Sequence, residues 1–82
     1  MFVKVPQDNG FRYFEFKCLT GAQIVDESVI FFMDDDSVFN VTFVDADTAE
    51  EVVDDMIRCS MTDNFYEIYK EDVVEVVDGE YN

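Results

Sequence analysis

One segment of this chain has the periodicity of an α-helix, and it limits what the remaining residues can form. Residues 45–61 read DADTAEEVVDDMIRCSM, in which apolar residues recur every three or four positions and acids fill most positions between them. A helix with this pattern buries one side and leaves the other in water. The β-branched and aromatic residues on either side of the segment favour strands. The sequence therefore predicts a sheet covered by one helix.

The length and composition are those of one folded domain. With 82 residues the chain has room for one modest core, so we expect residues 1–82 to form a single domain. Twenty acids and five bases give a net charge of −15, which by itself would suggest disorder. However, 49% of the residues are hydrophobic, far more than disordered chains carry. We therefore predict a folded, strongly anionic domain.

The strand signals begin with a hairpin, because Asn9-Gly10 is the strongest short-range signal for a two-residue hairpin turn. Counting outward from that turn gives the opposed pairs Val5 with Phe14, Val3 with Phe16, and Lys4 with Glu15. Pro6 places the first strand at a sheet edge, because proline cannot donate a ladder hydrogen bond. Thr20-Gly21 ends the second strand, and residues 22–27 form a connection to which the sequence assigns no secondary structure.

Four further segments complete the predicted sheet. Residues 28–33 (SVIFFM) are apolar throughout, which is typical of a central strand, and residues 38–44 (VFNVTFV) alternate as a strand with one wet face does. Residues 65–70 (FYEIYK) and 73–77 (VVEVV) follow the helix as closing strands. The predicted fold class is α+β, an antiparallel sheet of about five or six strands in the order β-β-β-β-α-β-β, covered by one amphipathic helix.

The helix itself has a predicted start and two predicted faces. Asp47 or Thr48 can cap it, with Glu50 or Glu51 completing a capping box. Its apolar face comprises Ala49, Val52, Val53, Met56, Ile57 and Ser60. Its wet face comprises Asp47, Glu50, Glu51, Asp54, Asp55 and Arg58.

Residues suited to catalysis or metal binding are few. The chain has no histidine, no glycine-rich phosphate loop and no cysteine-histidine ligand set, so we expect neither an enzyme nor a cofactor. Residues 15–17 (Glu-Phe-Lys), with Asp8 upstream, are similar to the ligand pattern of metal-dependent nucleases, but pairing of Lys4 with Glu15 also explains them. Asp34, Asp35 and Asp36 lack the spacing of a calcium loop and are expected to form an exposed turn, where a loose cation contact stays open.

The two cysteines and the overall hydropathy indicate a reducing, aqueous compartment. Cys18 and Cys59 are too few and too far apart in sequence for a disulfide framework, so we interpret them as reduced, small core residues. No secretion signal or apolar run of membrane-spanning length is visible. We expect a soluble protein of the cytoplasm, the host cytoplasm if a phage encodes it.

The acids of the helix are arranged at a cost to helix stability. Glu50 with Asp54, and Glu51 with Asp55, place like charges four residues apart, where they repel. The excess is also regional, because residues 42–82 carry a net charge of −11 and residues 1–41 only −4. Carboxylates at this spacing form a row along the helix that imitates a phosphate backbone. Proteins that bind nucleic acids through Lys and Arg would be drawn to such a row.

Small, strongly acidic, histidine-free domains of this plan resemble phage-encoded nucleic-acid mimics, which include anti-CRISPR proteins, restriction inhibitors and uracil-DNA glycosylase inhibitors. The resemblance covers the character of the whole chain. It implies that Glu50, Glu51, Asp54 and Asp55 substitute for phosphates, with Asp47 as a further partner-binding residue. It also implies supporting charge at Asp34, Asp35, Asp36, Glu67, Glu71 and Asp72. Exposed aromatic residues such as Tyr66, Tyr69 and Tyr81 would add contacts beside these charges.

The predicted function is therefore a non-enzymatic inhibitor that occupies the basic groove of a nuclease, CRISPR effector, glycosylase or polymerase subunit. The charge excludes direct binding to nucleic acid or to anionic membranes. The alternative is an acidic interaction module, of antitoxin or adaptor type, that binds through an exposed sheet edge or through the apolar residues 73–77. The sequence leaves open whether the protein is a monomer or a dimer.

Overall fold

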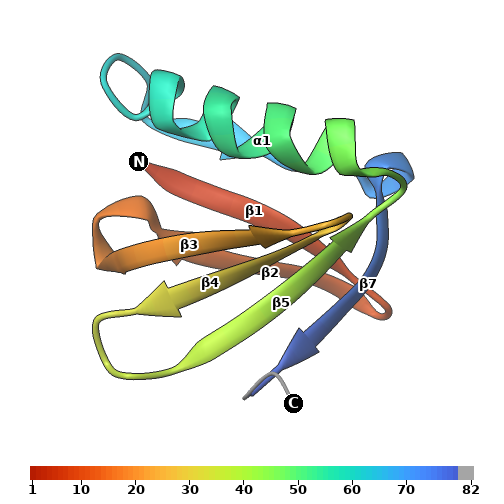
Figure 1. The fold of residues 1–82 in the computed structure, drawn as a ribbon. Helices are drawn as coiled ribbons and strands as arrows, with labels where there is room; N and C mark the ends of the chain where they lie inside the picture. The colour runs from red at the N-terminus through yellow and green to blue at the C-terminus, as the bar shows by residue number, and fades with distance from the viewer. Residues whose placement is uncertain (80–82) are drawn as a thin grey trace.

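The computed structural model describes residues 1–79 and contains seven strands, one α-helix and two short 3-10 helices in that range. In chain order these are β1 (Phe2–Gln7), β2 (Gly10–Glu15), η1 (Phe16–Cys18), β3 (Leu19–Val25), β4 (Ser28–Met33), β5 (Val38–Phe43), α1 (Ala46–Cys59), β6 (Phe65–Glu67), η2 (Lys70–Asp72) and β7 (Val73–Asp78). The predicted α+β class is confirmed, and α1 lies along one side of the strands (Figure 1).

The strands form two sheets, where the sequence predicted one. One sheet has the order β2-β1-β6 and the other the order β3-β4-β5-β7. The turn of η1 takes the chain from the first sheet to the second. Among residues 1–79 all pairs are antiparallel except β1 with β6, which run parallel. Parallel strands need a long connection, and the chain from β2 to α1 supplies it. As predicted, β4 is central.

The first hairpin forms, but its predicted register is wrong. Gln7 pairs with Gly10, so the turn residues are Asp8 and Asn9, and Val3 lies opposite Phe14. Gly10 follows the turn with φ of 151°, a conformation that side-chain-bearing residues rarely adopt. The predicted register differs by two residues, and an even shift leaves every side chain on its predicted face.

Charged partners in this hairpin also differ from the prediction. Glu15 accepts a hydrogen bond from the amino group of Met1, with an N–O distance of 2.6 Å, and does not pair with Lys4. The Lys4 ammonium lies 3.9 Å from a carboxylate oxygen of Glu67 and 3.9 Å from the centre of the Phe11 ring. Only Glu15 of the nuclease-like pattern lies on a strand, because β2 ends there and Phe16 and Lys17 belong to η1.

Two expectations are wrong, one about which strand lies at a sheet edge and one about where a strand ends. β1 is the middle strand of its sheet, although Pro6 suggested an edge. β6 is only three residues long and pairs with residues 2–4, so Pro6 lies beyond the stretch where β1 has partners on both sides. Thr20-Gly21 does not end a strand, because it lies at a register shift inside β3, which also contains most of the unassigned residues 22–27.

The core lies between the two sheets and α1. Rings from both sheets meet in it, since the Phe14 centroid lies 6.0 Å from that of Phe31 and 5.3 Å from that of Phe39. The fully buried large side chains are Val3, Val5, Val29, Phe31, Phe39, Val41, Phe43, Met56 and Ile68. Arg12 of β2 lies over the Phe39 ring and forms an ion pair with Asp78 of β7. These contacts connect the two sheets.

The alternation predicted in β5 holds on its inner face only. Phe39, Val41 and Phe43 are buried as expected. Asn40, expected on a wet face, is 6% exposed, because it lies between Ile30 of β4 and Val77 of β7. The outer face of this sheet is therefore apolar around Asn40.

Candidate functional site

The candidate site is the outward face of α1. The helix begins two or three residues earlier than predicted, because Asp45 caps it by accepting a hydrogen bond of 2.7 Å from the Thr48 N–H. Neither Asp47 nor Thr48 is the cap, and the predicted capping box does not form. The Thr48 N–H holds the pKa of Asp45 below its usual value. Burial of Ala49, Val52 and Met56 then fixes which face of the helix meets solvent.

Four carboxylates lie along the solvent face of the helix. The residues are Asp47, Glu50, Glu51 and Asp54, and all four are exposed. At 1.5 Å per residue the row is about 10 Å long, the rise of about three nucleotides of one DNA strand. We call these four residues the carboxylate row.

The row has no cation of its own within residues 1–79. Arg58 is the one base on α1, and its guanidinium donates to Asp55, with a distance of 3.0 Å between Nη1 and Oδ1. Asp55 is therefore partly neutralised and only half-exposed, and it contributes less free charge than the sequence suggested. The four carboxylates of the row stay available to an outside cation.

Two more of the expected acids lie beside the start of α1. Val44, just before the helix cap, donates a backbone hydrogen bond of 3.0 Å to the carbonyl of Asp72 in η2. This contact places Glu71 and Asp72 at the N-terminal end of the carboxylate row (Figure 1). Burial, followed by the charges of Asp55 and other neighbours, raises the pKa of the Tyr66 phenol to about 12.

The other expected acids lie elsewhere. Glu67 faces Lys4 on the β2-β1-β6 sheet. Asp34, Asp35 and Asp36 form the β4–β5 turn, which lies at the opposite side of the molecule from α1 (Figure 1). Asp35 accepts hydrogen bonds from the backbone N–H and the hydroxyl of Ser37, which lower its pKa, so it shapes the turn. The structure thus brings together the helix and η2 acids and separates these from the rest.

Side chains able to hold a metal ion do not gather in the described part of the chain. Among residues 1–79 no group of three His, Cys, Asp or Glu side chains has the necessary proximity. Cys18 and Cys59 are free, and both are half-buried where the sequence suggested core positions. Burial, with the neighbouring Asp63, raises the pKa of the Cys59 thiol. Over the same residues, no helix is long and apolar enough to cross a membrane.

Exposed aromatic residues gather on the β2-β1-β6 sheet, away from the positions that the sequence predicted. Tyr69 is exposed as expected, Tyr66 is half-buried, and Tyr81 lies outside the described residues. The outer face of the β2-β1-β6 sheet carries four exposed rings, those of Phe2, Phe11, Tyr13 and Phe65. The two-residue spacing of Phe11 and Tyr13 within β2 was the signal that could have revealed this patch.

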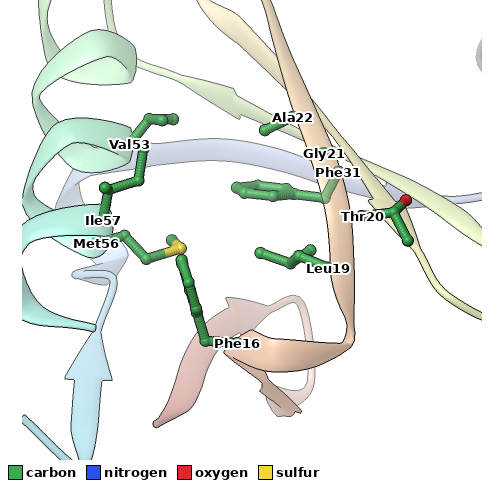
Figure 2. A pocket seen from close by; sticks show the side chains of 9 residues that line it. All are labelled: Phe16, Leu19, Thr20, Gly21, Ala22, Phe31, Val53, Met56 and Ile57. Carbon is green, nitrogen blue, oxygen red and sulfur yellow. The ribbon is translucent and has the colours of Figure 1, made fainter. Parts of the chain in front are cut away.

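A groove between α1 and β3 was also missed. Its volume is about 180 Å³, and it is lined by Phe16, Leu19, Thr20, Gly21, Ala22, Phe31, Val53, Met56 and Ile57. Figure 2 shows the helix side chains facing those of β3 and β4 across it, whereas the Thr20 side chain points away. The uncharged run of residues 19–25 was the signal in the sequence.

Comparison of the chain with protein-family models, with curated protein sequences and with solved structures finds no match.

Proposed function

We propose that this protein is a non-enzymatic inhibitor that acts as a nucleic-acid mimic. It places the carboxylate row of α1 in the basic DNA- or RNA-binding groove of a host defence or DNA-processing protein in the cytoplasm. The observation that carries the proposal is the row itself, four exposed carboxylates on one rigid helix without an internal cation among residues 1–79. The partner's Lys and Arg side chains supply the missing counter-charges.

The position of the row supports this proposal. A helix whose apolar face is buried holds its carboxylates at fixed spacing, so little side-chain and backbone freedom is lost on binding. Glu71 and Asp72 continue the negative surface past the helix N-terminus. A surface of one sign raises the association rate with a basic groove and makes binding sensitive to salt.

The first test combines capture with competition. The immobilised protein is exposed to host lysate, bound proteins are eluted with salt, and each purified candidate is titrated with this protein in the presence of a double-stranded oligonucleotide. We expect the oligonucleotide and this protein to displace each other, because both occupy one groove. A partner that binds both at once, or that resists high salt, would contradict the mimic and favour binding through a sheet edge.

A matched pair of variants separates position from total charge. Glu51→Lys with Asp54→Lys interrupts the row and leaves Glu50 and Asp55 each four residues from a new opposite charge, so the helix stays folded. Asp8→Lys with Asp34→Lys makes the same change in net charge at exposed hairpin turns outside α1 and β3. We expect the first variant to bind the partner about 100-fold more weakly and the second nearly normally. Equal losses in both would indicate charge attraction without a defined site.

A further inference from the structure

The free edge of β3 differs from the other sheet edges of this molecule. The edge strands are β2 and β6 in one sheet and β3 and β7 in the other. β2 carries Arg12 and Glu15, β7 carries Glu75 and Asp78, and β6 has three residues, one of them Glu67. Charges and shortness of this kind prevent an edge from adding further strands. β3 has seven residues, no charge and no proline.

The exposure of β3 leaves this edge accessible. Residues 20–25 are all exposed, and within residues 1–79 β3 pairs only with β4. Alternate residues of an edge strand direct their backbone N–H and C=O groups away from the sheet. An extended segment laid along β3 can therefore form a regular hydrogen-bond ladder with it.

The groove beside β3 can receive side chains from such a segment. Its wall on the helix side is Val53, Met56 and Ile57, and its floor includes Phe31 (Figure 2). Every second side chain of an added strand would point toward the same side of the sheet as Ala22. The volume of about 180 Å³ has room for an aliphatic side chain there.

Charge identifies the chemistry of the segment. Glu50 and Asp54 precede Val53 and Ile57 by three residues each, so they flank the groove on the helix surface. Asp26 and Glu27 stand at the end of β3. A segment with Lys or Arg next to its apolar residues complements this rim. A second copy of the chain does not, because two molecules of charge −15 repel.

We propose that β3 and the groove between β3 and α1 bind an extended segment of the basic partner, by strand addition, with aliphatic side chains at alternate positions and Lys or Arg between them. The location of this site follows from β3 itself, whereas the identification of the segment's source as the inhibited protein rests on the proposed function. The carboxylate row and the β3 edge then form one continuous contact. The row binds basic side chains of the partner, and the β3 edge forms hydrogen bonds with an extended backbone.

The test uses a synthetic peptide of about seven residues, a typical strand length, that alternates Val with Lys. It is titrated into isotopically labelled protein and followed by NMR, with amide hydrogen exchange measured at saturation. We expect shifts in β3 and at the groove side chains, together with slower exchange of β3 amides that face solvent in the free protein. A peptide of the same composition with a central Pro should bind weakly, because Pro interrupts the ladder.

Variants at the two edges of the same sheet give the control. Ala22→Gln with Ile57→Gln makes the groove polar and should weaken the peptide about tenfold. Val74→Gln with Val77→Gln alters exposed residues of β7 and should leave the affinity unchanged. Shifts confined to α1, no protection of β3 amides, or a larger loss in the β7 variant would overturn the proposal.

The same titration separates this proposal from the proposed function. The Glu51→Lys, Asp54→Lys variant should still protect β3 amides on adding a peptide in which Thr replaces Lys, even though it no longer competes with the oligonucleotide. Loss of competition with retained β3 protection supports both assignments. Competition by the parent protein without any β3 protection would leave the mimic standing and refute the strand-addition site.

Discussion

At the scale of single residues, Asn40 is the side chain whose environment fits it least. It is 6% exposed, and its Oδ1 atom has no hydrogen-bond partner among residues 1–79. An unpaired polar atom removed from water destabilises the fold, because it loses solvation and gains nothing in return. Thr42, two residues further on the same face, differs, since its hydroxyl lies 3.1 Å from that of Ser28.

We therefore expect Asn40→Leu to stabilise the protein by about 1 kcal/mol, because it removes the unpaired acceptor at nearly constant volume. Thr42→Val is the control, and it should lower stability because it leaves the Ser28 hydroxyl without its partner. Urea denaturation of the three proteins measures both changes. A loss of stability in Asn40→Leu would mean that the amide has a favourable interaction in solution.

At the scale of elements, α1 depends on its N-terminal cap, Asp45, which precedes the first apolar residue of the helix's periodic pattern. Asp45 satisfies a backbone N–H that the helix cannot satisfy itself, and its charge lies at the positive end of the helix dipole. The cap also sets where the helix leaves β5, and hence where the carboxylate row begins. A loosened cap should therefore affect both stability and partner binding.

We predict that Asp45→Ala lowers the melting temperature by several degrees, whereas Asp45→Ser largely preserves it. The pH dependence has a definite sign. Because the folded pKa of Asp45 lies below the unfolded value, its contribution to stability is present above the ordinary aspartate pKa of 3.8 and is lost as pH falls through the folded pKa. Thermal melts from pH 6 down to pH 2 should show that the difference in melting temperature between parent and Asp45→Ala narrows below that ordinary pKa. A difference in melting temperature that does not change with pH would show that the effect comes from the conformational propensity of residue 45 and not from its charge.

At the scale of the whole molecule, charge works against compactness. The net charge of −15 is held within principal extents of 31, 27 and 25 Å. At physiological ionic strength the Debye length is about 8 Å, so the repulsion between the acids of α1 and those of the β4–β5 turn, on the opposite side of the molecule, is weak. At low salt the same acids repel across the molecule and raise the free energy of the folded state.

We expect the melting temperature to rise by several degrees between low and moderate sodium chloride, because screening relieves this repulsion. The Glu51→Lys, Asp54→Lys variant and its control Asp8→Lys, Asp34→Lys should both depend less on salt than the parent. Calorimetry in a series of salt concentrations measures the slope. A melting temperature that falls with salt would show that ion pairs such as Lys4 with Glu67 outweigh the repulsion.

The sequence by itself determined the local features of this protein. Residues 45–61 predicted α1 and its two faces, the apolar residues 28–33 predicted a central strand, and even side-chain alternation assigned the faces of β1 and β2 correctly even with the wrong turn. These features depend on the period of the chain, 3.6 residues for a helix and two for a strand, which neighbours in sequence reveal.

Only the tertiary structure decided the division into two sheets, the parallel pairing of β1 with β6, and the burial of Asn40. It also decided which acids are neighbours, since Glu71 and Asp72 adjoin α1 while Asp34, Asp35 and Asp36 lie apart from it. The groove beside β3 needs residues from η1, β3, β4 and α1 together. Pairing between segments distant in sequence depends on how the whole core closes, so no local pattern of residues encodes it.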